Sequence, residues 1–119
     1  MFLILKIIII FIFIDYLIHQ FYTKNYNITI SNDLYKYRII CCSAYWLLIC
    51  FIITSNLFSF NLIQYLLYSS IISFILYLSI NLYNKTYNKN YSIQFIIADI
   101  FYGILLTNIL ILITFYFLK

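Results

Sequence analysis

Hydrophobic residues form long, nearly continuous runs along this chain, and few polar residues interrupt them. The first run extends from Phe2 to Phe21 and contains Asp15 and His19. A helix needs about 20 mostly apolar residues to cross a bilayer, because the hydrocarbon is about 30 Å thick and the helical rise is 1.5 Å per residue. This run therefore predicts one membrane-spanning helix over residues 2–21.

The central segment from Ile39 to Asn84 contains no charged residue. As a single helix it would extend about 69 Å, more than twice the hydrocarbon thickness, so the chain must turn back on itself. A hairpin is expected at the polar residues Thr54, Ser55, Asn56, Ser59 and Asn61. The pattern predicts helices over 39–54, 61–83 and 93–118, the last long enough to cross with tilt. We expect a single all-α domain over 1–119, an integral membrane bundle of four transmembrane helices.

The composition indicates the same class of protein. Apolar residues make up 66% of the chain and charged residues 8%, with a mean hydropathy of +1.03. Soluble domains carry roughly 25% charged residues, and a chain this short has too much surface to bury so many apolar ones. The expected partner is the lipid bilayer. The net charge of +4 is not clustered in a basic patch, so nucleic acid is not expected.

The abundance of Ile, Phe, Tyr, Asn and Lys is typical of an AT-rich genome, such as that of a large DNA virus, a protist or an organelle. A viral source would place the protein in a host membrane. The basic residues predict its orientation. The expected first and third loops hold five basic residues, which are Lys24, Lys36, Arg38, Lys85 and Lys89. The other face holds two, Lys6 and Lys119. By the positive-inside rule, the first and third loops are cytoplasmic and both termini lie on the opposite side.

Two acidic residues inside the expected spans are the main candidates for a functional site. Asp15 and Asp99 each lie about 10 Å below the same membrane surface on this topology. Carboxylates at such depth are costly and usually face the bundle interior. If the first and fourth helices bring them together, they would share a proton, as in a proton relay or a cation site. The alternative is that each carboxylate bonds polar neighbours and only fixes the packing.

Three further polar residues are expected near these acids. His19 follows Asp15 by four residues, which places both side chains on one helix face. The favoured interpretation of His19 is an interfacial histidine near the lipid head groups. Asn81 and Asn84 end the expected third helix at the same level. A metal would need at least two more ligands, and the sequence has no matching cluster, so neither a metal nor another cofactor is expected.

A stripe of small residues follows Asp99 along the last helix. Gly103 and Thr107 lie at successive intervals of four residues, and small residues let membrane helices approach closely. No nucleophile–base arrangement or phosphate-binding loop is visible, so an enzyme is not expected. The cysteines Cys41, Cys42 and Cys50 lack metal-binding spacing and are interpreted as small apolar residues.

Three segments of the chain resemble a known family. They are Asp15-Tyr16-Leu17, Ser79-Ile80-Asn81-Leu82-Tyr83-Asn84, and Ala98-Asp99-Ile100-Phe101-Tyr102-Gly103 continuing to Thr107. Together they resemble the small four-span membrane proteins called domain of unknown function 2177, found in bacteria and large DNA viruses. Asn81 stands where that family carries an acid. The resemblance implies the four-helix architecture and a shared polar cluster, and it implies no reaction.

Two functions fit these observations. The first is binding or transport of a small polar solute, a cation or a proton at the polar cluster. Four helices are too few to line a wide pore, so transport would require a homo-oligomer. The second is a structural or assembly subunit of a larger membrane complex, for example a respiratory complex encoded by an AT-rich genome.

Overall fold

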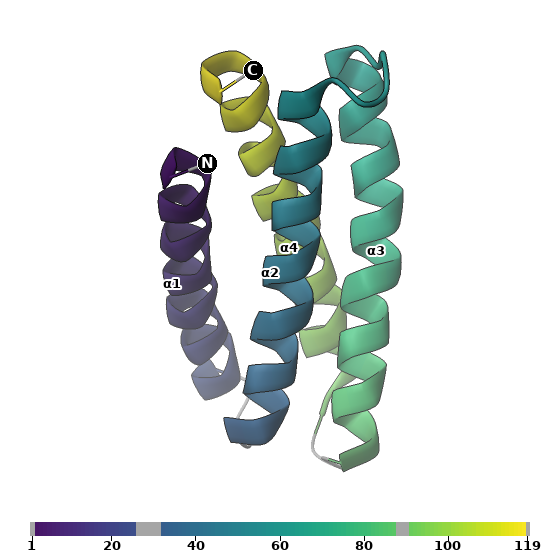
Figure 1. The fold of residues 1–119 in the computed structure, drawn as a ribbon. Coiled ribbons are helices and arrows are strands. Elements are labelled where there is room, and N and C mark those ends of the chain that lie inside the picture. Colours follow the sequence, from purple (N-terminus) through teal and green to yellow (C-terminus); the bar gives the residue numbers. More distant parts are fainter. Residues whose placement is uncertain (1, 26–31, 88–90, 119) are drawn as a thin grey trace.

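The computed structural model describes residues 2–25, 32–87 and 91–118, which form a bundle of four helices running up and down in turn (Figure 1). The helices are α1 (Phe2–Asn25), α2 (Asn32–Ser55), α3 (Leu62–Tyr87) and α4 (Ile93–Ile113), and a π-helical turn, η1 (Thr114–Leu118), continues α4. Each of the four is long and apolar enough to cross a membrane. The expected all-α, four-helix architecture is confirmed.

Helix α2 differs from the expected boundaries. It begins at Asn32, whereas the apolar pattern placed its start at residue 39. Loss of apolar character does not by itself end a helix, and the segment contains no proline or glycine that would stop one. Arg38 and Lys36 therefore belong to α2, and their assignment to the first loop was wrong. Lys24 and Lys85 likewise lie in the last turns of α1 and α3 and not in loops.

The turn between α2 and α3 lies at the predicted polar cluster and is fixed by local hydrogen bonds. Asn56 adopts a left-handed backbone conformation (φ 55°), and the amide of Leu57 donates to the carbonyl of Ile52 at 3.3 Å, which closes the end of α2. At the start of α3, Asn61 and Gln64 form a reciprocal capping box, each side chain accepting from the other's amide at 2.8–2.9 Å. Both ends of the described bundle, the start of α1 and the end of η1, lie at this end, and the last turns of α1 and α3 lie at the opposite end (Figure 1).

The interior of the bundle is built around α4, the most buried of the four helices. On the α1–α2 side, the Phe11 ring packs edge-on against Trp46, with ring centroids 5.9 Å apart. The indole Nε1 of Trp46 donates to the hydroxyl of Thr107 at 3.2 Å. Thr107, expected on the small-residue stripe, thus supplies the acceptor that a buried indole N–H needs.

Gly103, also expected on that stripe, allows α3 and α4 to approach closely. The Tyr77 ring of α3 lies flat against it, and a Cβ atom built on Gly103 would overlap three carbons of that ring. Tyr77 is fully buried, so other side chains enclose the ring. This site therefore accepts only glycine without displacing an aromatic ring.

A larger residue at this position is expected to destabilise the bundle. Gly103→Val should lower the free energy of unfolding by about 1–3 kcal/mol, the usual cost of overpacking a dense core. Thermal unfolding in detergent, followed by circular dichroism, measures the loss. Leu105→Val, on the exposed face of α4, is the control. In the double variant Gly103→Val, Tyr77→Ala the loss should be smaller than the sum of the two single losses, because the ring that the valine would strike is gone. A Gly103→Val protein as stable as Leu105→Val would contradict the packing.

Candidate functional site

Arg38 is the centre of a charged network inside the bundle. It lies on the second turn of α2, and its side chain is 0% exposed. Its distance from Asn32, the first residue of α2, is about 9 Å along the helix axis. Asn81 and Asp99 lie at a similar distance from their ends of α3 and α4. These residues therefore meet at one level, nearer the α1–α2 and α3–α4 connections than the hairpin.

Both carboxylates contact the same guanidinium. The Nε and Nη2 groups of Arg38 donate to the two oxygens of Asp15 at 3.1 and 2.9 Å. Its Nη1 and Nη2 groups donate to the two oxygens of Asp99 at 2.6 and 2.9 Å. Each carboxylate thus occupies one edge of the planar guanidinium, an arrangement that a lysine ammonium cannot provide.

The two acids do meet at the interior as expected, but not as a directly paired couple. A cation lies between them, so the interaction is a three-residue ion network instead of two carboxylates sharing one proton. Asp15 and Asp99 are each 2% exposed. The network joins α1, α2 and α4 through charge-assisted hydrogen bonds.

Asn81 extends the network to α3. Its Nδ2 group donates to Asp99 at 2.7 Å and to the Tyr77 carbonyl of its own helix at 2.7 Å. The hydroxyl of Tyr91, which precedes α4, donates to the Oδ1 atom of Asn81 at 2.9 Å. Burial raises the pKa of Tyr91 to about 12, which keeps this hydroxyl protonated and able to donate. Asn84 joins at the edge, where its Nδ2 group donates to the Tyr91 hydroxyl at 3.4 Å.

Tyr77 connects the network to the apolar core. Its ring centroid lies 5.2 Å from the Cζ atom of Arg38, within the range of a cation–π interaction. The same ring packs on Gly103. The glycine therefore contributes to the site indirectly, by admitting the aromatic ring that packs against Arg38.

His19 is buried near this network but forms no hydrogen bond with it. Its ring packs against Tyr35 and Phe95, with centroid distances of 5.3 and 5.8 Å. Its Nε2 atom has no hydrogen-bond partner among the described residues. Within those same ranges, no three His, Cys, Asp or Glu side chains are grouped as metal ligands. The spacing of four residues predicted that His19 shares a helix face with Asp15. In the structure its side chain is buried, and its ring packs on two aromatic side chains beside the network.

Arg38 is the residue that the sequence analysis missed. It directly precedes the uncharged segment, so it was counted with the loop lysines. Two signals could have identified it. It is the only arginine in a chain with several lysines, and two carboxylates in a membrane require a counter-ion.

Comparison with known proteins adds no assignment. The chain matches no protein-family model, no curated protein and no solved structure. The class that the fold and the network define is an α-helical membrane protein with a buried Asp–Arg–Asp network.

Removing the central cation is expected to destabilise the protein strongly. Arg38→Met leaves two buried carboxylates without a counter-ion, so the free energy of unfolding should fall by roughly 3–5 kcal/mol. Lys36→Met, which removes an exposed cation from the same helix, should change it by less than about 0.5 kcal/mol. Unfolding in detergent mixtures measures both variants.

The triple variant Asp15→Leu, Arg38→Met, Asp99→Leu tests the reason for that loss. Because all three charges are removed together, it should recover most of the stability lost in Arg38→Met. Equal stabilities of Arg38→Met and Lys36→Met would contradict the ion network.

Proposed function

We propose that the Asp15–Arg38–Asp99 network is an intramembrane site that binds a proton or a small cation. The observation that carries this proposal is the number of charges in the network. Two buried carboxylates contact one guanidinium, and no second basic side chain forms an ion pair with them within the described ranges. With both carboxylates ionised, the network has one negative charge in excess.

An excess charge in this setting is energetically costly. The three side chains are almost completely inaccessible, and the surrounding helices are apolar enough for the hydrocarbon region. Desolvation of an unpaired ion there costs several kcal/mol. A bound proton or monovalent cation would remove the excess, and ionisable residues inside a membrane commonly mark such pathways.

The two carboxylates are held differently, which suggests where the proton would bind. Asp99 accepts hydrogen bonds from both Arg38 and Asn81, which lie on different helices, and Asp15 accepts two from Arg38 and lies beside the Tyr102 hydroxyl. A proton on Asp15 would turn one of its acceptor oxygens into a donor. One of the two bonds from Arg38 would then be lost, and the contact between α1 and α2 would weaken while Asp99 stayed paired.

The orientation in the membrane and the need for a homo-oligomer are part of this proposal. Without Arg38, four lysines (five basic residues minus one) still lie in the last turn of α1, the first turns of α2, the last turn of α3 or the segment that follows α3. Two basic residues lie on the other face, so the predicted orientation keeps its sign. The network would then lie toward the cytoplasmic surface. Transport across the whole membrane would require a homo-oligomer, because a single bundle has its interior filled by side chains. The resemblance to domain of unknown function 2177 supports a shared polar cluster at these positions.

Proton flux into proteoliposomes tests the proposal. Purified protein is reconstituted with a pH-sensitive dye inside, and a membrane potential is imposed. Asp15→Asn removes the excess charge while keeping the side-chain shape, so flux should fall about a hundredfold or more, the lower end of the range for losing a proton-transfer group. The flux through Asp99→Asn should fall by a similar factor. Asn108→Ala, which removes a polar side chain of α4 that contacts α3 serines instead of the network, should retain the flux.

Circular dichroism of each reconstituted variant separates loss of flux from loss of fold. Flux in folded Asp15→Asn and Asp99→Asn equal to that of the unchanged protein would rule out the proposed site. Absence of flux in the unchanged protein, together with its co-purification with larger partners in mild detergent, would instead favour the assembly-subunit function.

A further inference from the structure

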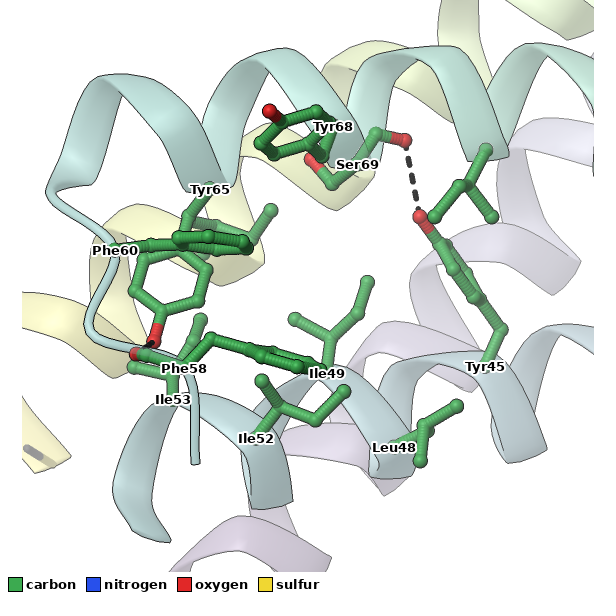
Figure 2. Close-up of a pocket in the computed structure, with 12 residues that line it drawn as sticks. Tyr45, Leu48, Ile49, Ile52, Ile53, Phe58, Phe60, Tyr65, Tyr68 and Ser69 are labelled. Atoms are coloured by element: carbon green, nitrogen blue, oxygen red, sulfur yellow. Dashed lines mark hydrogen bonds between the residues drawn. The ribbon is translucent and has the colours of Figure 1, made fainter. Parts of the chain in front are cut away.

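A second feature lies at the opposite end of the bundle from the ion network. A cavity of about 190 Å³ opens between α2 and α3 beside their hairpin (Figure 2). Its walls are almost entirely apolar and include Leu48, Ile52, Phe58, Phe60, Tyr68 and Ile72. An apolar cavity of about 150 Å³ is already large enough to stay dry and accept a benzene molecule. A hydrocarbon ligand is therefore the chemistry that fits this one.

Two of the three tyrosine hydroxyls at the cavity bond to the protein instead of facing a ligand. The hydroxyl of Tyr45 donates to the Ser69 carbonyl at 2.9 Å (Figure 2) and lies 3.2 Å from the Ser73 hydroxyl. The hydroxyl of Tyr65 donates to the Phe58 carbonyl at 2.8 Å. With these hydroxyls paired, the walls offer a ligand mainly carbon surface.

The cavity has the length and position of a lipid acyl chain. Its α2 wall extends from Tyr45 to Ile53, about 12 Å along the helix axis. One leaflet contributes about 15 Å of hydrocarbon, half the bilayer thickness. The cavity runs from the middle of α2 to the hairpin, so its long direction follows that of the chains in one leaflet.

The cavity is also accessible from the lipid side. Leu48 and Ile72, on its two walls, are 56% and 50% exposed. Because the outer faces of α2 and α3 lie against hydrocarbon in a membrane, the molecules that reach this opening are lipid chains. No charged residue occurs between Ile39 and Asn84. Nothing in the hairpin or the two walls therefore selects a charged head group.

From these observations we infer that one acyl chain of a membrane phospholipid occupies the cavity between α2 and α3. Recognition rests on van der Waals contact with the hydrocarbon, since lipid and protein surfaces are equally apolar here. A zwitterionic and an anionic lipid with the same chains should therefore bind alike. This inference is independent of the ion network and of its proposed function.

Native mass spectrometry of the delipidated protein tests this. The probes are phosphatidylcholine and phosphatidylglycerol with identical acyl chains, each added in a mild detergent. The expected result is one retained lipid for each, with similar occupancy. Ile72→Trp should lose the bound-lipid peak because the indole fills the cavity. Ile71→Trp, an equally exposed neighbour outside the lining, should keep it.

A second pair of variants, on the α2 wall of the cavity, keeps the test valid if the first pair does not fold. Leu48→Trp should lose the lipid and Leu47→Trp should keep it, because only Leu48 lines the cavity. Circular dichroism identifies any variant that has lost its helices. The inference is overturned by no retained lipid, by retention of the anionic lipid alone, or by lipid retained in both folded lining variants. A dimer that forms in place of lipid binding would overturn it as well, because a second copy would then cover the cavity.

Discussion

The structure depends on one guanidinium placed between two carboxylates inside an apolar bundle. Arg38 alone has the geometry for this position, since its planar fork offers one edge to Asp15 and another to Asp99. The helices themselves have little hydrophobic reason to associate within lipid, because the hydrocarbon around them is equally apolar. Charge-assisted hydrogen bonds therefore do much of what hydrophobic burial does in a soluble protein. Together with Asn81, they connect all four helices at one level.

The fold could be predicted from the sequence because membrane crossing depends on length and apolar content. Those two quantities identify four spans, and the polar residues near Asn56 and Asn61 identify the central hairpin. The start of α2 could not be predicted in the same way. Apolar content reports where a segment can enter hydrocarbon, while the helical hydrogen bonds of α2 continue through Tyr35 and Arg38 without an apolar signal.

That difference of about two helical turns explains what was missed at the site. The sequence identified Asp15, Asp99 and Asn81 because polar residues are rare within the spans, and the structure brings all three together. Arg38 was placed in a loop, so the two acids were expected to pair with each other. The spacing of His19 from Asp15 predicted that the two share a helix face, and the His19 ring packs on Tyr35 and Phe95. Spacing fixes a helix face, whereas contacts across the bundle depend on neighbours that a single sequence does not reveal.

The two ends of the bundle are chemically different, and Tyr77 joins them. Toward the α1–α2 connection, the interior holds charges and amides; toward the hairpin, it holds an indole, aliphatic chains and an apolar cavity. Tyr77 lies between Arg38 and Gly103, touching the charged part with one contact and the tightly packed α3–α4 interface with another. The only arginine and the only glycine of the chain therefore contact the same aromatic side chain, so the ion network and the close α3–α4 packing both depend on the position of Tyr77.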